Sequence, residues 1–387
     1  MSDLRLRYDE PATGIGHPTL PDSVNRLFTA DHNNDGTHRF FVDARHFGIV
    51  GDNVTDDTAA VQAAIDYAAT LPVLTSLRNT ATVLVPYGLY KVTSQIVVPS
   101  GVNLHCEGIL YNNLADAWQP LVWFKAGSHC SKVQLWGNLG SGVKFGEVGT
   151  SCDMAIGDVR LWNIGEEYDG VKGSKKGVHF TGYNFTFDSI DCDGGNLGID
   201  IDGASDVRGN KILTWGASTG VRLTSGSEHI YLNSVDIDTP SYKGLQIDSS
   251  HDLAIHDCTI FLNDQQLPGG IVNAAVIGEH SGGDKVNNLR IHLSVQDTGG
   301  QALKVYNILD SQIFLNVTNA PLGTGNLNLI TSGIEFSTGV EATTQISASF
   351  GNVATKITGT GGCVTYTEAG ALKYRGSAGT ITVLGAA

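Results

Sequence analysis

The chain has 387 residues, of which only 16% are charged, and its formal net charge is −15. This acidity argues against binding to a nucleic-acid backbone, which requires a basic stripe, and no apolar run is long enough to span a bilayer. The 48 glycines, the 10 prolines and the frequent Val, Ile and Thr indicate many short strands joined by tight turns. The six cysteines show no metal-ligand spacing, so we expect free, buried thiols.

The first 39 residues lie outside the repeats of the chain, and residues 31–38 among them are polar, rich in turns and unable to build a core. Within them, residues 31–38 (Asp-His-Asn-Asn-Asp-Gly-Thr-His) are similar to short hinge segments of bacteriophage tail proteins. The chain also begins without the apolar stretch of a secretion signal. We expect residues 1–39 to form an attachment or hinge segment outside the main fold.

Residues 47–66 combine a glycine-rich turn with an acidic pair and a short amphipathic helix. Asp56 or Asp57 is expected to cap this helix, because a carboxylate accepts hydrogen bonds from the unpaired N–H groups of the first turn. The apolar residues repeat with helical periodicity and predict one buried stripe: Ala60, Val61, Ala64, Ile65 and Ala68. Such a stripe requires an apolar surface, for which the open end of a stack of strands is suitable.

A predicted strand with the sequence Val-Pro-Tyr-Gly-Leu-Tyr at residues 85–90 follows this helix. The glycine-rich turn, the helix and this strand together resemble the N-terminal module of the pectate-lyase-like right-handed parallel β-helix superfamily. The family usually has glycine where this chain has Asn53, a mild departure because Asn tolerates a positive φ. The resemblance implies an all-β solenoid of three-strand coils with an N-terminal capping helix.

The middle of the chain contains a repeat that predicts the same fold independently. A glycine followed by two apolar residues that flank one variable residue recurs at Gly177, Gly198, Gly220 and Gly244, at intervals of 21, 22 and 24 residues. These intervals match one coil of a solenoid. Each copy is followed by a turn and two further short strands with a two-residue corner between them. Three strands per coil predict a triangular parallel β-helix.

Alternation along the strands assigns side chains to the interior. One predicted column of inward side chains comprises Val178, Ile199, Val221 and Leu245, with Phe180, Ile201, Leu223 and Ile247 two residues further along. A second comprises Cys192, Thr214, Ile237 and Ile260.

The last segment, residues 370–384, is similar to a short β segment that closes many phage tail proteins. We therefore expect four parts: an attachment or hinge segment (1–39), an N-terminal module with the capping helix (40–110), parallel β-helix coils (111–350) and a C-terminal β segment (351–387).

The outward residues of the repeated strand predict a first polar ladder: Lys144, His179, Asp200, Arg222 and Gln246. Because neighbouring strands are about 4.8 Å apart, these side chains should line one face. His179 and Arg222 are candidate substrate-binding residues, and Asp200 is a candidate catalytic carboxylate.

A second set of outward residues lies at the end of the last strand of each coil: Asp193, Trp215, Asp238 and Phe261. Asp193 and Asp238 would be separated by roughly 9–10 Å at the backbone, because they lie two coils apart. Inverting glycosidases place their carboxyl groups about 6.5–9.5 Å apart. Trp215 would supply a flat face for a sugar ring. The resemblance places a substrate groove along these strands and loops, where Glu167 and Tyr242 are further candidates for substrate binding.

Each of these groups also has a purely structural interpretation. Asp193 and Asp238 are ordinary turn residues, the ladder can be a solvated stripe of ion pairs, and Trp215 can pack against Phe261. The hypothesis of a functional groove depends on the convergence of His, Arg, Asp and Trp on adjacent coils.

Three functions are consistent with this pattern. The first is an endo-acting hydrolase of a bacterial capsular polysaccharide or exopolysaccharide, of the phage tailspike type, in which paired carboxylates act as acid and base without a cofactor. The second is a polysaccharide lyase or related epimerase acting on uronic acids, with Arg222 or Lys144 neutralising the carboxylate, His179 or Tyr242 as base, and calcium as an optional ion. The third is a non-catalytic glycan receptor-binding tail protein.

The resemblance further implies a homotrimer in a virion tail or another extracellular setting, with tail or baseplate proteins as partners.

Overall fold

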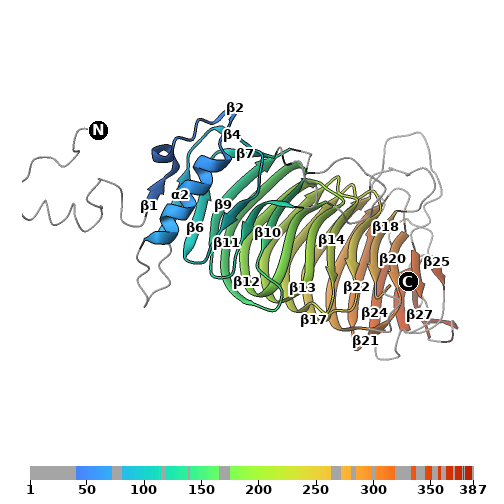
Figure 1. Cartoon of the computed structure of the whole chain (residues 1–387). Coiled ribbons are helices and arrows are strands. Elements are labelled where there is room, and N and C mark those ends of the chain that lie inside the picture. The colour runs from blue at the N-terminus through green and yellow to red at the C-terminus, as the bar shows by residue number, and fades with distance from the viewer. Residues whose placement is uncertain are drawn as a thin grey trace, which may run out of the picture.

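The structure is a computed structural model of the whole chain. It describes residues 41–71, 81–112, 114, 119–137, 140–164, 175–262, 272–279, 285–297, 301–318, 333–336, 345–350, 356–358, 363–368, 371–376, 378 and 380–385. Residues 1–39, which we expect to be a hinge segment, lie outside this set, as does Glu167. The described part forms one long stack of parallel strands with a helix at its N-terminal end (Figure 1).

Helix α2 (Thr58–Thr70) lies across the N-terminal end of the stack, next to the short 3₁₀ helix η1 (Ala44–Phe47) (Figure 1). Its buried side chains include Val61, Ala64, Ile65 and Ala68, as the periodicity predicts, whereas Ala60 is only half-buried. The helix is also tied to the stack through hydrogen bonds, because the Gln62 side-chain amide donates to the Val97 carbonyl and accepts from the Val97 N–H. The stripe therefore covers the first coils.

The two acidic residues before the helix have different roles. Asp56 Oδ1 accepts from the backbone N–H of Thr58 at 3.0 Å, and thus satisfies an unpaired donor of the first helical turn. Asp57 occupies the N-cap position but makes no side-chain capping bond. Its carboxylate instead accepts from the backbone N–H groups of Val50 and Gly51. Asp56 therefore fulfils the expected capping role, and Asp57 holds the glycine-rich turn in place.

The first coils consist of short strands that pair in parallel with strands one coil further on. They are β1 (Phe41–Asp43), β2 (Asp52–Asp56), β3 (Ala81–Val85), β4 (Leu89–Val92), β5 (Ile96–Val98), β6 (Val102–Cys106) and β7 (Ile109–Asn112).

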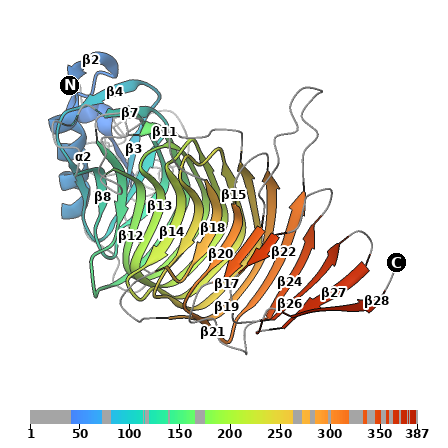
Figure 2. The same ribbon diagram turned by 90° about the vertical axis from the view of Figure 1, so that its right-hand side faces the viewer.

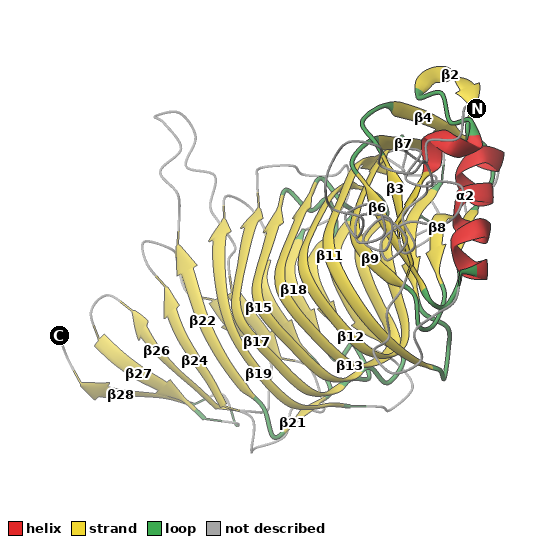
Figure 3. Ribbon diagram, turned by 90° about the vertical axis from the view of Figure 1, so that its left-hand side faces the viewer, coloured by secondary structure: helices red, strands yellow, loops and turns green. Residues whose placement is uncertain are grey.

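Two kinds of strand make up the later coils, and Figure 3 shows them stacked side by side. The first kind, which includes the copies of the repeat at Gly220 and Gly244, comprises β8 (Pro120–Phe124), β10 (Ser141–Phe145), β14 (Thr219–Thr224), β16 (Lys243–Ile247), β18 (Asn273–Ile277), β20 (Gln301–Val305), β23 (Gly333–Phe336) and β25 (Lys356–Thr358). The others are β9 (His129–Trp136), β11 (Ser151–Ile164), β12 (Lys176–Gly194), β13 (Leu197–Trp215), β15 (Glu228–Asp238), β17 (His251–Leu262), β19 (Val286–Asp297), β21 (Ile308–Leu309), β22 (Gln312–Thr318), β24 (Gln345–Phe350) and β26 (Cys363–Glu368).

The corners predicted between the second and third strands do not interrupt the strands. Asn233 and Ser234 lie inside the continuous strand β15, and in β17 the register shifts between Ile255 and Cys258 instead of the strand ending. In β12 and β13 the repeat itself belongs to the same 19-residue strand as the rest of the coil. Bends and bulges therefore replace several of the expected breaks.

The interior follows the predicted columns. Val178, Ile199, Val221 and Leu245 pair in register from coil to coil and are fully buried. The second column, from Cys192 to Ile260, is also in register and buried. Five cysteines of the described part are free and buried, and burial raises the pKa of thiols such as Cys192. These columns fix which side chains of each coil face outward.

The repeated glycines are required because adjacent coils approach closely. A methyl group at Gly198 would lie 2.6 Å from the carbonyl oxygen of Gly220, and one at Gly220 would lie 2.8 Å from that of Gly244. We expect Gly198→Ala to lower the free energy of unfolding by about 1–3 kcal/mol, because the added methyl overpacks the stack. Chemical denaturation measures this loss. Gly376→Ala is the control, since its methyl would have no neighbour nearer than 3.5 Å, and equal stability of the two variants would contradict the explanation.

The stack ends in an antiparallel ribbon. Strand β27 (Ala371–Arg375) pairs antiparallel with β26, and β28 (Ile381–Gly385) pairs antiparallel with β27, so the parallel coils end here (Figure 2). Ile381, Val383 and Leu384 of this ribbon are exposed. No helix in the described part is long and apolar enough to cross a membrane.

Candidate functional site

The predicted polar ladder is in register on one face of the stack. Lys144 pairs with His179, His179 with Asp200, Asp200 with Arg222, and Arg222 with Gln246. The alternation of the repeated strands thus places these side chains on successive coils, as expected.

Asp200 is the centre of an ion cluster in this ladder. Its side chain is fully buried. Arg222 donates two hydrogen bonds to it, from Nε to Oδ1 at 2.8 Å and from Nη2 to Oδ2 at 3.0 Å. Lys176 Nζ lies 2.6 Å from Oδ2. Burial of a carboxylate is tolerated only when it is paired in this way.

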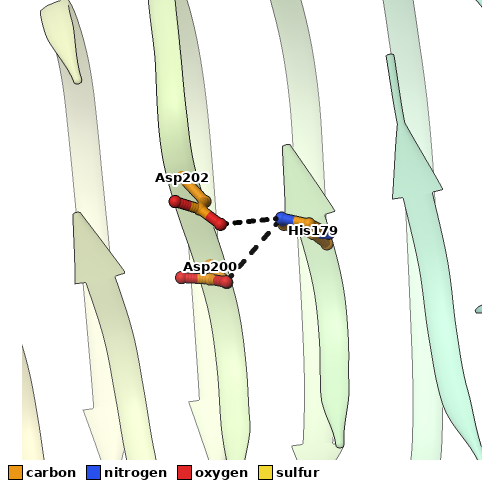
Figure 4. Close-up of side chains that lie close together, drawn as sticks. All are labelled: His179, Asp200 and Asp202. Carbon is orange, nitrogen blue, oxygen red and sulfur yellow. Dashed lines mark ion pairs between the residues drawn. The ribbon is translucent and has the colours of Figure 1, made fainter. Parts of the chain in front are cut away.

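Two members of this cluster, Lys176 and Asp202, were not predicted. Asp202 follows Asp200 by two residues on the same strand, so both carboxylates point toward His179 (Figure 4). The hydrogen bond from His179, with a further one from Ser225 and the nearby Lys176 charge, holds the pKa of Asp202 well below its ordinary value, against the opposing effect of burial. The two-residue spacing from Asp200, which puts both side chains on the same face of the strand, could have identified Asp202 from the sequence. Lys176 carried no comparable signal because it stands at the very start of its strand.

The cluster neutralises itself. Ligand atoms of His179, Asp200 and Asp202 lie within 4.8 Å of one another, a distance suitable for a metal ion. However, Lys176 Nζ is 3.1 Å from His179 Nε2, 2.6 Å from Asp200 Oδ2 and 3.7 Å from Asp202 Oδ2. The ammonium group therefore already occupies the position of a cation, and Arg222 binds both oxygens of Asp200. These contacts do not fit a metal site.

For Arg222, burial lowers the pKa, but its hydrogen bonds and ion pair with Asp200 outweigh burial and leave the pKa raised. Burial, together with the charges of Lys125 and Lys176, lowers the pKa of Lys144. Lys144 and Lys125 also lie over the Trp123 ring, with Nζ at 4.7 and 3.0 Å from the ring centroid. The charged side chains of the ladder thus interact with one another or with the Trp123 ring.

A second row of outward residues, which we call the aromatic–acidic row, lies at or near the C-terminal ends of β12, β13, β15 and β17. Asp193 pairs with Trp215, Trp215 with Asp238, and Asp238 with Phe261. Trp215 is 53% exposed. Burial raises the pKa of Asp238, against one hydrogen bond from the Thr239 backbone. The register that the repeat predicts for these four residues is therefore confirmed.

The aromatic–acidic row is longer than the sequence indicated. Tyr111 pairs with Trp136, and Trp136 with Trp162. Trp162 and Asn163 form a bulge opposite Asp193, since the register passes from Leu161↔Cys192 to Ile164↔Gly194. The row therefore runs in chain order through these residues: Tyr111, Trp136, Trp162, Asp193, Trp215, Asp238 and Phe261. The bulge and the unequal coil lengths before Lys176 hid the first three members.

The other predicted residues lie elsewhere or outside the described part. Tyr242 directly precedes β16, where its ring lies 5.0 Å from Lys243 Nζ. Glu167 is among the residues that the structure does not describe. A separate cavity of about 440 Å³ lies among β17, β19, β22, β24, β26 and β27, and no predicted site residue lines it.

Comparison with known proteins gives a family match for the N-terminal module. Residues 41–117 match the family described as "Rhamnogalacturonase A/epimerase, pectate lyase-like". A segment of 61 residues is 44% identical to a glucan 1,3-beta-glucosidase of Cochliobolus carbonum. That segment is 16% of this chain and only 7% of the relative, so the chain matches a small part of the length of this curated protein.

Solved structures resemble the whole stack. A mutant tailspike protein of E. coli bacteriophage HK620, in complex with a pentasaccharide, has a TM-score of 0.50 at 13% identity, covering 94% of this chain and 86% of the tailspike chain. PfbA, a surface adhesin of Streptococcus pneumoniae, has a TM-score of 0.43 at 12% identity, covering 89% and 98%. At 13% identity the likeness to the tailspike concerns the fold alone.

Proposed function

We propose that this chain, a pectate-lyase-like right-handed parallel β-helix protein, is an endo-acting glycoside hydrolase that depolymerises a bacterial capsular polysaccharide or exopolysaccharide. The observation that carries the proposal is the register of Asp193, Trp215 and Asp238 on three successive coils. Two carboxylates thus flank an exposed indole in one row. The family match of residues 41–117 and the pentasaccharide complex of the tailspike relative support a carbohydrate substrate.

The spacing in this row suits inversion. Neighbouring coils are about 4.8 Å apart, so the backbones of Asp193 and Asp238 are separated by roughly 9–10 Å. Side chains inclined toward each other reach the separation of about 6.5–9.5 Å at which a water molecule fits between a base and the sugar. Asp238 is assigned as the general acid, because burial raises its pKa and so favours the protonated form. Asp193 is assigned as the base, and Trp215 stacks on the sugar ring.

The ion cluster has a supporting role in this mechanism. Both oxygens of Asp200 are held by Arg222, and Lys176 adds a third contact. We therefore assign Asp200 to positioning Arg222 and not to proton transfer. His179 and Arg222, each partly exposed on the ladder, remain the proposed contacts to sugar hydroxyl groups.

The direct test is incubation with purified bacterial capsular polysaccharides and exopolysaccharides. A hydrolase produces new reducing ends without the ultraviolet absorbance of an unsaturated uronic acid. Binding without either product across the whole set would contradict an enzymatic function and leave a glycan-binding protein.

The pH profile provides a second test. As the pH rises through the pKa of Asp238, the acid loses its proton and kcat/KM is expected to fall. Burial raises this pKa, so the fall should lie at higher pH than for an exposed aspartate. A rate that continues to rise on the alkaline side would contradict the assignment of the acid.

A second candidate, a polysaccharide lyase or epimerase, is favoured by one observation. Burial and two neighbouring lysines lower the pKa of Lys144, which increases the fraction of its amine that is neutral and able to accept a proton. Against this candidate, the charge of Arg222 is already paired with Asp200 and is poorly placed to neutralise a uronate. Formation of an unsaturated product, with or without added calcium, would favour the lyase.

We also propose that the chain works as a homotrimer on a phage tail or another extracellular surface. Residues 31–38 and 370–384 are similar to tail-protein segments, and the ribbon exposes apolar side chains that association could cover. Light scattering coupled to size exclusion should give three chain masses in solution, and a monomer would contradict this proposal.

A further inference from the structure

The N-terminal half of the aromatic–acidic row is an aromatic surface without an assigned role. Tyr111, Trp136 and Trp162 lie on three successive coils immediately before the carboxylates. Trp136 is 37% exposed, and Tyr111 and Trp162 are half-buried. By contrast, aromatic side chains of the core such as Phe124 and Phe145 are fully buried. These three rings therefore present a face to the outside of the stack.

The backbone fixes this part of the row to the catalytic part. The N–H of Gly137 donates to the Trp162 carbonyl at 3.1 Å. The equivalent bonds further along join Gly216 to Asp238 at 3.1 Å and Thr239 to Phe261 at 2.9 Å. The same backbone hydrogen bond to the next coil therefore follows Trp136, Trp215 and Asp238. The aromatic residues before Asp193 are continuous with the proposed site, one coil apart at about 4.8 Å.

The rings form a surface and not isolated points. The Tyr111 and Trp136 ring centroids are 5.2 Å apart with the planes inclined by 52°. The three aromatic members carry no charge, and the row reaches a charged residue only one coil before Tyr111, at Lys91. On the other side of the carboxylates, the aromatic part of the row ends at Phe261, since the next residue in register is Gln296. The row is therefore asymmetric about its carboxylates.

This chemistry matches the apolar C–H face of a neutral pyranose ring. Such a face packs on an indole or phenol ring, while the sugar hydroxyl groups at the ring edge stay in water. A row of rings at one-coil intervals can contact successive sugar residues of an extended glycan chain. A charged sugar would gain no partner from this part of the row.

We propose that Tyr111, Trp136 and Trp162 form a stacking surface for neutral pyranose residues that holds one side of the polysaccharide during cleavage between Asp193 and Asp238. This inference rests on the proposed hydrolase function. It implies that the segment of glycan over the N-terminal coils is held more firmly than the segment over Phe261. After each cut, the product over Phe261 should therefore dissociate before the product over the N-terminal coils.

Binding is tested in an Asp193→Asn/Asp238→Asn background by affinity electrophoresis, with purified capsular polysaccharides and exopolysaccharides in the gel. Trp136→Ala and Trp162→Ala should each weaken retardation by about tenfold, because each removes one stacked ring. Tyr231→Ala is the matched control: Tyr231 is 43% exposed on the same stack but lies outside the row. Its retardation should not change. Circular dichroism melting verifies that all variants are folded.

Cleavage supplies an independent measurement. In the chain that keeps both carboxylates, end-labelled oligosaccharides of a susceptible polymer should be cut at a different distance from the label after Trp136→Ala. If the polymer is bound and cut but neither tryptophan variant changes affinity or cleavage position, the stacking surface is wrong and the hydrolase stands. If the tryptophan variants weaken binding but the unaltered carboxylates cut nothing, hydrolysis is wrong and the surface stands. Absence of all binding overturns both, and a change of oligomeric state without a change of affinity would make the row a contact between copies of the chain.

Discussion

Replacing Asp193 or Asp238 by asparagine is expected to lower kcat on a susceptible polysaccharide by about 10²–10⁴-fold, the usual contribution of a general acid or base. Asparagine keeps the shape of the side chain but can neither donate a carboxylic proton nor accept one. The affinity of the variants for the glycan should remain, since Trp215 and the ladder are unchanged. Release of reducing ends measures kcat, and affinity electrophoresis measures binding.

The chain contains a matched control for this experiment. Asp191 and Asp236 lie two residues before Asp193 and Asp238 on the same strands. Each is opposite Leu213 in the intervening coil, and burial raises the pKa of both. They thus share the two-coil spacing but lack an intervening indole. Asparagine at these positions should leave kcat within a factor of a few, whereas loss of activity there alone would move the catalytic pair to Asp191 and Asp236.

The second large effect is on stability. Arg222→Ala is expected to lower the free energy of unfolding by about 3–5 kcal/mol, the usual cost of removing one partner from a buried ion pair. The fully buried Asp200 would lose both hydrogen bonds from the guanidinium and keep its contacts with Lys176 and His179. Chemical denaturation measures the loss.

Two further variants define the cause of this loss. Arg208→Ala removes an exposed arginine from the same strand as Asp200 and should change stability by no more than about 0.5 kcal/mol. Asp200→Asn in the Arg222→Ala background should restore part of the loss, because it removes the uncompensated charge. If Arg222→Ala is as stable as Arg208→Ala, the cluster is a solvated stripe and not a buried one.

Much of the fold followed from local patterns. The spacing of Gly177, Gly198, Gly220 and Gly244 predicts one coil per repeat, and the structure pairs these strands in that register. Alternation then places the core columns correctly, since successive side chains of a strand face opposite sides. The stripe of helix α2 was predicted in the same way, with Ala60 at its margin.

Parts of the candidate site did not follow from these patterns. The register before Lys176 was hidden by unequal coils and by the bulge at Trp162 and Asn163, so the row was recognised only from Asp193 onward. Lys176 carried no signal, because it stands at the start of its strand and its ammonium group reaches Asp200 on the adjacent coil. Outward position was also read as exposure, yet Asp200 points outward and is fully buried.

By itself, the sequence determined a right-handed parallel β-helix with a helix at its N-terminal end, the coil length, and the division of each strand into inward and outward residues. The coil length and the inward–outward division are local properties, set by the interval of the repeated glycines and by alternation, whereas the right-handed winding is what the family resemblance of the N-terminal module implies. Only the tertiary structure decided which outward residues are neutralised by an ion pair and which are exposed to a ligand. Stacking brings side chains more than 20 residues apart in the chain to about 4.8 Å, and at that distance charges such as Asp200 and Arg222 pair while Trp215 stays exposed.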